Sequence, residues 1–428
     1  MTTREKTMRK ITGVLASLAF AALSGTALAA DKEVTFLNWV TAEPSNAAVV
    51  QGLIDQTGVK VNVLSSSWGD MQKNVFLRVR TKQDLDVYQS SAKWLPTFAQ
   101  LPNLVDFNDL YGKDYLESMI PQAVLAAGQF KGKQYGMPWN IGSISLVSNK
   151  AVLEKAGVSS SPKTLAEFTA ALEKVKAADA QSTPYAMMTK DNNLISSDFQ
   201  LWLWAHGGSI FDDQDNLVIN SDATVATLNF MKDLVDRKLA SLDTDRGAAR
   251  RMFGQGNTAF YFDAPVAKGF ARDFSGQGAD YDVNVLPIET PVAKDGMTSH
   301  SMEWGHLLIM LKSDNAKVDG KISKDSPSAK FVAGLSMNDD VQLDYFTKLG
   351  AIPVTKTARN NPLITKDKFI VDWNNSLGLP KRNELSPLKD SANYVAIVSE
   401  EVQSVILGKK DAKEAAAEME KRIARILK

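Results

Sequence analysis

The chain has 428 residues, 49 basic and 49 acidic side chains, 44% apolar residues and no cysteine. The lack of cysteine excludes disulfide bonds, cysteine-bound metals, thiol nucleophiles and a lipid attached through cysteine. The balanced charge lacks the positive excess that nucleic-acid binding requires, so we expect no nucleic-acid partner.

The N-terminus predicts a cleaved secretory signal peptide. A basic start is followed by an apolar run over residues 11–23 and by the small-residue stretch Ala27-Leu28-Ala29. The run is shorter than the roughly 20 residues that a membrane helix needs. We therefore expect residues 1–29 to be removed and the mature protein to be soluble in the periplasm. It then carries 45 basic and 48 acidic side chains, which also argues against a membrane-surface protein.

Short strands alternate with capped helices along the mature chain. Helix starts are predicted at Thr164, at Ser221 or Asp222, and at Asp411, in two cases with Glu three residues later. The strand candidates are residues 34–37, 59–64, 85–88, 144–147, 259–262 and 281–286. The alternation predicts an α/β fold with mostly parallel sheets. About 400 residues exceed one core, so we expect two lobes that share the chain.

Signatures of catalysis and of cofactor binding are missing from the sequence. His206, His300 and His306 show no metal-binding spacing, and there is no dinucleotide, P-loop or nucleophile-elbow motif. We therefore expect no cofactor, no metal and no enzymatic activity. His206 follows a predicted helix, where an imidazole commonly bonds to free carbonyl groups. A pair of glycosidase carboxylates needs no motif, so a periplasmic glycan hydrolase stays an alternative.

Several of the eight tryptophans fall just past a predicted strand and beside small or polar residues. Trp39, Trp68, Trp139 and Trp304 have this setting. Ligands of open α/β sheets bind outside the carboxyl ends of the strands. Indole faces suit the apolar faces of sugar rings, whereas Asp, Asn and Ser satisfy the hydroxyl groups. Each tryptophan alone could equally pack in a core; together they favour a ligand cleft.

Motifs in the same order over almost the whole mature chain resemble the carbohydrate-type solute-binding proteins of ABC importers, the maltose-binding-protein-like family. The most telling is Gly132-Lys133-Gln134-Tyr135-Gly136-Met137-Pro138. The others include Phe253-Gly254-Gln255-Gly256-Asn257-Thr258 and Leu349-Gly350-Ala351-Ile352-Pro353.

The resemblance implies two α/β lobes joined by hinge strands, with the ligand in a cleft between them. Lobe 1 would hold residues 30–141 and about 303–350, and lobe 2 residues 142–302 and about 351–428. The protein would act as a monomer and deliver a sugar or sugar derivative to the transmembrane subunits of an ABC permease. Transferred by position, the ligand-binding residues would include Trp304 and Gly305 from a returning loop over residues 300–305. The others would be Trp39, Glu43, Trp68, Asp70, Ser90, Ser91, Trp94, Trp139, Asn140, Ser197, Asp198, Trp202 and Asp263.

The chain departs from the family where ligands sit. Asp263-Ala264-Pro265 replaces the usual Gly-Pro-Trp, so that another residue, with Trp304 as the candidate, would have to supply the stacking platform. Arg382 is either a solvated loop cation or a partner for an acidic group on the ligand. A polyamine or other small cation stays an alternative ligand, with Asp70, Asp198 and Asp263 as charge partners and tryptophans around it.

Overall fold

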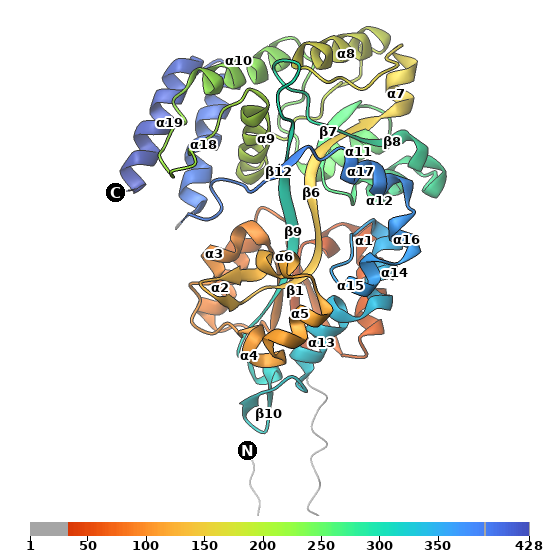
Figure 1. Cartoon of the computed structure of the whole chain (residues 1–428), viewed down its shortest axis with the longest axis vertical. Coiled ribbons are helices and arrows are strands. Elements are labelled where there is room, and N and C mark those ends of the chain that lie inside the picture. Colours follow the sequence, from red (N-terminus) through yellow and green to blue (C-terminus); the bar gives the residue numbers. More distant parts are fainter. Residues whose placement is uncertain (1–32, 389–390, 428) are drawn as a thin grey trace, which may run out of the picture. The chain divides into compact units, whose positions relative to one another are not determined.

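The computed structural model describes residues 33–388 and 391–427, so the expected signal peptide lies outside the described residues. One large mixed sheet is flanked by helices that come from distant parts of the sequence (Figure 1). None of the helices in the described part of the chain has both the length and the apolar character of a membrane span.

The large sheet has the order β2-β1-β3-β9-β6-β7, with β12 paired to β9 and β8 paired to β6. Its strands are β1 Val34–Asn38, β2 Val61–Ser65, β3 Val87–Ser91, β6 Met137–Asn149, β7 Phe260–Asp263, β8 Val285–Ile288, β9 His300–Met310 and β12 Leu379–Lys381. Two small hairpins pair β4 Gln129–Phe130 with β5 Lys133–Gln134, and β10 Lys317–Val318 with β11 Lys321–Ile322. Only the pairings of β1 with β2 and β3 and of β9 with β12 are parallel, so the expectation of a mostly parallel sheet is wrong.

The predicted helix starts are confirmed. Thr164 and Glu167 form a reciprocal capping box, Ser221 accepts from the backbone of Thr224, and Asp411 accepts from Glu414 N–H. The helices are α1 Pro44–Gln56, α2 Met71–Thr81, α3 Leu95–Phe98, α4 Phe107–Tyr111, α5 Lys113–Met119, α6 Gln122–Leu125, α7 Lys150–Lys155, α8 Leu165–Ala178, α9 Asn192–Ala205, α10 Asp222–Asp236, α11 Arg246–Gly254, α12 Ala267–Ser275, α13 Pro327–Met337, α14 Asp339–Leu349, α15 Lys356–Arg359, α16 Pro362–Thr365, α17 Lys368–Asn375, α18 Ser391–Ile406 and α19 Ala412–Leu427.

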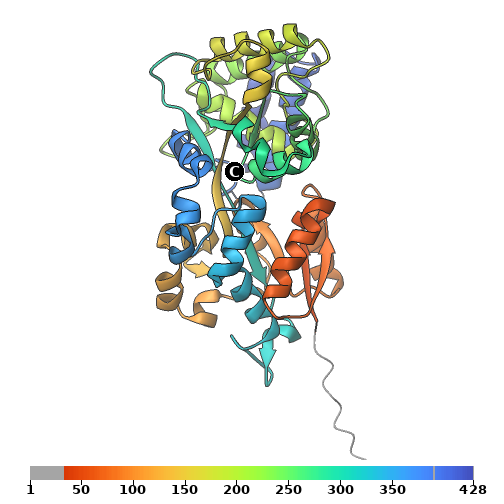
Figure 2. The ribbon, with the colours of Figure 1, turned by 90° about the vertical axis from the view of Figure 1, so that its right-hand side faces the viewer.

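The first core surrounds the sheet formed by β1, β3 and β9. Phe36 packs with α1, α13 and α14 on one face, and Leu37 packs with α2 and α3 on the other, because neighbouring side chains of a strand point to opposite faces. Figure 2 shows α1, in red, beside the light blue α14, which it contacts.

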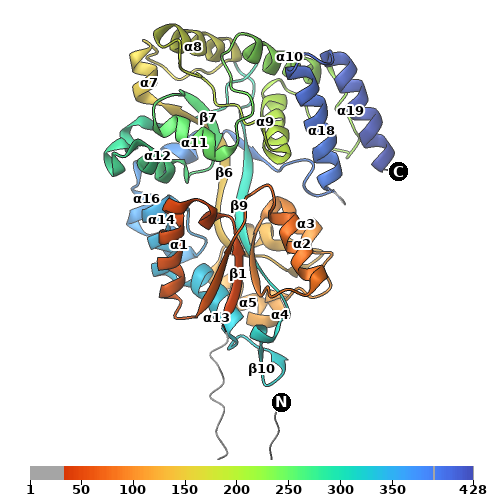
Figure 3. The ribbon, with the colours of Figure 1, turned by 180° about the vertical axis from the view of Figure 1, so that it is seen from behind.

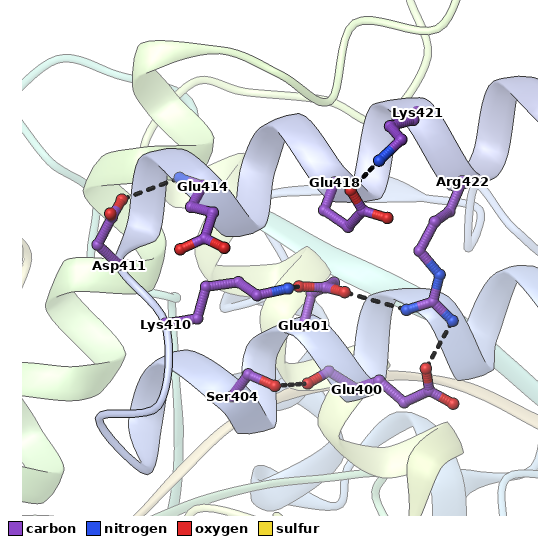
Figure 4. A network of polar contacts seen from close by, with 9 residues as sticks. All are labelled: Glu400, Glu401, Ser404, Lys410, Asp411, Glu414, Glu418, Lys421 and Arg422. Carbon is purple, nitrogen blue, oxygen red and sulfur yellow. Dashed lines mark hydrogen bonds and ion pairs between the residues drawn. The ribbon is translucent and has the colours of Figure 1, made fainter.

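The second core lies among β7, α8, α9, α10 and α18, with Phe168 and Trp202 at its centre. Figure 3 shows α18 and α19 side by side next to α9 and α10. Between α18 and α19, the almost fully buried Glu401 accepts from Lys410 and Arg422 (Figure 4). The predicted lobes correspond to two such cores, but their exact boundaries stay a prediction.

The long strands β6 and β9 contribute to both cores and run side by side between them (Figure 1). The sequence predicts a strand only over residues 144–147 of β6, whereas the strand begins at Met137. Pro138 lies at a register irregularity, where its missing N–H is tolerated. The expected loop over residues 300–305 is the start of β9, and residues 281–284 belong to the 3-10 helix Gly278–Asn284. Partner strands that are remote in sequence stabilise β6 and β9, so no local pattern reveals their length.

Candidate functional site

A cavity of about 620 Å³ lies where the two cores meet. Residues after β1, β2 and β3 and from α1 line one side, residues from α9 and α11 line the other, and β9 contributes Met302 to His306 between them. The lining residues are Trp39, Val40, Ala42, Glu43, Asn46, Ser67, Trp68, Gly69, Ser91, Ala92, Lys93, Ile144, Lys190, Asp191, Leu194, Ser197, Asp245, Arg246, Gly247, Arg250, Val266, Phe270, Met302, Glu303, Trp304, Gly305, His306, Tyr345 and Leu349.

Aromatic rings form one wall of this cavity. The ring centroids of Trp39 and Trp68 are 4.5 Å apart and the planes are nearly perpendicular, and the buried Trp94 supports Trp68 from 4.3 Å. His306 continues the wall, with ring centroids 4.8 Å from Trp39 and 4.3 Å from Trp304. Such a surface offers apolar faces together with ring N–H donors.

Two arginines of α11 line the opposite side and are held by one carboxylate. Arg250 donates to both oxygens of Asp263, at 2.7 and 2.9 Å, and Arg246 donates to one of them at 2.9 Å. The guanidinium of Arg250 also lies 3.7 Å above the ring of Phe270. Asp263 is completely buried, which raises its pKa, but Arg250 and Arg246 overcome this effect and lower the pKa to about 2. Asp263 therefore stays ionised and neutralises much of the arginine charge.

Further charged residues line the cavity. Lys190 lies 3.6 Å from Asp245, and Asp191 caps α9 by accepting from two backbone N–H groups. Lys93 Nζ lies 5.4 Å above the ring of Trp68. Burial lowers the pKa of Lys93 to about 8, against the attraction of Asp191. Acidic and basic side chains are thus mixed around the site, and no single sign of charge dominates.

The structure brings seven of the residues expected at the ligand into the lining of this cavity. They are Trp39, Glu43, Trp68, Ser91, Ser197, Trp304 and Gly305. The other eight do not line it: Asp70, Ser90, Trp94, Trp139, Asn140, Asp198, Trp202 and Asp263. Among these, Trp94 and Asp263 lie directly behind lining residues and support them.

Besides the buried Trp94, two further tryptophans among the eight lie in the cores. Trp139 is completely buried in the first core, with its ring stacked 5.0 Å from that of Tyr345. Trp202 is completely buried in the second core and donates to the hydroxyl of Tyr185. β6 and α9 turn these side chains inward, so neither the position of Trp139 after a proline nor the transfer of Trp202 by position indicated exposure.

The polar residues among the eight are engaged elsewhere. Asp70 is exposed and accepts from Ser67, and Ser90 donates to the carbonyl of Ser91. Asp198 is buried, and burial raises its pKa to about 7 against the pull of Arg246. Arg382 is exposed and does not line the cavity.

Sequence reasoning missed Asn46, Arg246, Arg250 and His306, which all line the cavity. For the arginines a signal existed, because they stand four residues apart and therefore share one face of the short helix α11 after its cap, Asp245. His206, in contrast, behaves as expected: its Nδ1 lies 2.8 Å from the carbonyl of Trp202 at the end of α9.

Two binding proteins are similar to this chain in sequence. The maltotriose-binding protein of Pyrococcus abyssi (strain GE5 / Orsay) is 24% identical over 336 residues, which are 78% of this chain and 69% of that protein. The diacetylchitobiose binding protein DasA of Streptomyces coelicolor is 31% identical over 116 residues, 26% of either chain.

Among solved structures, the GacH receptor of Streptomyces glaucescens GLA.O, known unliganded and in complex with acarbose, is similar with a TM-score of 0.77. The match covers 92% of this chain and 99% of that chain at 21% identity, so the likeness concerns the fold. The family model for bacterial extracellular solute-binding proteins matches residues 48–370. Since this match spans most of the sequence, the chain belongs to the bacterial extracellular solute-binding proteins.

Proposed function

We propose that this protein captures an uncharged sugar or short oligosaccharide between two lobes and delivers it to the permease of an ABC importer. The observation that carries the proposal is the cavity itself: indole rings on one wall and hydrogen-bonding groups opposite. This combination suits a sugar, whose ring faces are apolar and whose rim carries hydroxyl groups. The names of the maltotriose- and diacetylchitobiose-binding relatives support the same ligand class.

Trp304 is the residue that we propose as the platform missing after β7. It stands opposite Gly142 in the register of β6 and β9. A Cβ atom at Gly142 would lie 3.0 Å from Pro265 and 3.4 Å from the ring of Trp304. Glycine at this position therefore lets Trp304 and the Asp263–Pro265 segment approach each other, and Trp304 takes the place of the usual tryptophan after that strand.

Capture by closure is the mechanism that the lining supports. Gly69, before α2, is so close to Asp191, the N-cap of α9, that a Cβ atom there would lie 2.7 Å from the carboxylate. Gly247 approaches Glu43 in the same way, at 3.0 Å. A ligand that contacts both sides favours the closed arrangement by its differential affinity for it. We propose that the permease binds this closed form and that the lobe boundaries lie near residues 141, 302 and 350.

A cationic ligand lacks its proposed partners in the cavity. Asp263 is occupied by two arginines, Asp70 bonds to Ser67, and Asp198 is buried behind the lining. We also propose that the protein binds without hydrolysing, as the members of its family are binding proteins.

The test is thermal unfolding of residues 30–428, stripped of carried ligand by refolding, with maltotriose, diacetylchitobiose and glucose, and with spermidine as the cationic control. A sugar at 100 times its Kd should stabilise the fold by about 2.7 kcal/mol, because it binds only the folded state. Chromatography of the incubated sugar monitors hydrolysis. Stabilisation by spermidine alone, or turnover of the sugar, would overturn the proposal.

A variant pair localises the site. Trp304→Ala should weaken binding of the stabilising sugar by about 1–3 kcal/mol, as the loss of an aromatic contact does in other binding sites. Arg382→Ala, at an exposed position away from the cavity, should bind like the wild type. A loss of affinity in Arg382→Ala would instead indicate an acidic group on the ligand.

Export is the remaining part of the proposal. We propose that residues 1–29 are removed and that the mature protein works as a monomer in the periplasm. Mass spectrometry of the protein from a periplasmic extract should find Ala30 or Asp31 at the N-terminus, and light scattering should give the mass of one chain.

A further inference from the structure

His306 has an environment that determines which of its ring nitrogens carries the proton. It lies on β9 between β3 and β6, and only 6% of its surface is exposed. Its Nδ1 atom lies 2.9 Å from the side-chain nitrogen of Gln89 on β3 and 3.1 Å from that of Asn140 on β6. Two amide NH₂ groups thus face the same ring nitrogen.

Backbone groups hold both amides in this orientation. Gln89 Oε1 accepts from the N–H of Trp39 at 3.1 Å, and Asn140 Oδ1 accepts from the N–H of His306 itself at 3.3 Å. A flipped amide would place its oxygen at Nδ1 but would point its NH₂ group at a backbone donor. Nδ1 must therefore accept hydrogen bonds, and the proton of the neutral ring resides on Nε2.

The other ring nitrogen is available to a ligand. Within residues 33–388 and 391–427, no group accepts a hydrogen bond from Nε2, although the side chain lines the cavity. The rings of Trp39 and Trp304 pack against the imidazole and hold its orientation. Burial, with Arg250 and Arg246 nearby, keeps the pKa of His306 well below its usual value, so the ring stays neutral.

We propose that His306 determines specificity by donating its Nε2–H to an oxygen of the bound sugar, held in that tautomer by Gln89 and Asn140. The inference rests on the proposed function and names one polar contact of that site. A hydroxyl, ring or glycosidic oxygen satisfies this donor. An ammonium group, which can only donate, leaves two donors facing each other, and this mismatch disfavours amines at the same position.

Two substitutions of His306 distinguish the role of its Nδ1 atom from that of its Nε2 atom. His306→Asn keeps an oxygen near the place of Nδ1, so Gln89 and Asn140 retain an acceptor, but the ligand-facing donor is lost. His306→Gln places an amide NH₂ near the place of Nε2. For the sugar with the largest thermal shift, among maltotriose, diacetylchitobiose and glucose, we expect about a tenfold higher Kd for the Asn variant. The Gln variant should recover part of this loss.

The control for a general effect of the substitution is His206→Asn, which lies outside the cavity and should leave the Kd unchanged. The urea midpoints of both Asn variants, measured without sugar, report the structural cost separately. A wild-type Kd in His306→Asn, or weaker binding by the Gln variant than by the Asn variant, would overturn the proposal.

The tautomer is measured directly, without any sugar. In ¹⁵N-histidine-labelled wild-type protein, His306 should give the nitrogen shifts of an unprotonated Nδ1 and a protonated Nε2, and the sugar should shift the Nε2–H proton. An Nδ1–H tautomer refutes this inference alone. A wild-type protein that binds none of the sugars refutes the proposed function and the contact with it.

Discussion

Replacing Asp263 by asparagine tests the electrostatic design of the cavity. The substitution keeps the shape of the side chain but removes the charge that holds Arg246 and Arg250. Two guanidinium groups then remain beside each other at a place that is largely closed to water. We expect Asp263→Asn to fold but to be less stable than the wild type, and to lose the defined position of both arginines.

The magnitude follows from the pKa of this carboxylate. A fall from the ordinary value near 3.9 to about 2 corresponds to about 3 kcal/mol of stability at neutral pH. Breaking a fully buried pair costs roughly 3–5 kcal/mol. The arginine side chains are 19% and 14% exposed, so water can partly replace the lost partner. We therefore expect the lower end, about 3 kcal/mol.

The assay is urea unfolding followed by tryptophan fluorescence at several pH values. Because the folded pKa is depressed, the stabilisation is present above about pH 4 and is lost as the pH falls through about 2. The difference in free energy of unfolding between wild type and Asp263→Asn should thus be constant from pH 7 to 4 and should then decrease toward zero. Asp282→Asn is the matched control, since Asp282 is bound by Arg272 at 2.7 and 2.6 Å but is 27% exposed. It should cost about 1 kcal/mol or less. Equal costs for the two variants would refute the reasoning.

Three further outcomes are expected. Burial raises the pKa of Asp198 to about 7, so the folded state binds this proton more tightly than the unfolded state does. The free energy of unfolding of the wild type should therefore fall as the pH rises from about 4 through 7. Asp198→Asn should lack this pH dependence, which urea midpoints at pH 5 and 8 measure. Glu401→Gln should destabilise the α18–α19 pair by about 3 kcal/mol, because it leaves Arg422 without its buried partner (Figure 4). Glu400→Gln changes a side chain that is 55% exposed and should cost under about 1 kcal/mol in the same measurement. Trp139→Ala should lower the free energy of unfolding by about 3–5 kcal/mol because it empties part of the first core; an unchanged urea midpoint would show that the indole is not core.

Features that depend on neighbouring residues could be predicted from the sequence. The capping box at Thr164 is formed by contacts within a few residues, and the apolar run that begins at Val34 is a local pattern; both predicted elements are present. Trp39 and Trp68 follow strands β1 and β2 and line the cavity, as segments after strands often do, whereas Trp304 lines it from within β9; that these residues bind the ligand stays a prediction. The fold class followed from the order of such local signals along the chain and from the family resemblance.

The length of β9, the orientation of each indole and the charge state of the cavity were decided by tertiary structure. Trp139 and Trp304 have similar sequence surroundings, yet pairing of β6 with β9 turns one into the first core and the other into the cavity. The sequence offered Asp263 as a charge partner for a cationic ligand, but in the structure two arginines of α11 bind its carboxylate. The tautomer of His306 depends on Gln89 and Asn140, which are more than 160 residues away along the chain. Local sequence therefore determined which elements form, whereas the register between distant strands decided which side chains meet the ligand, because a strand shows opposite faces at successive residues.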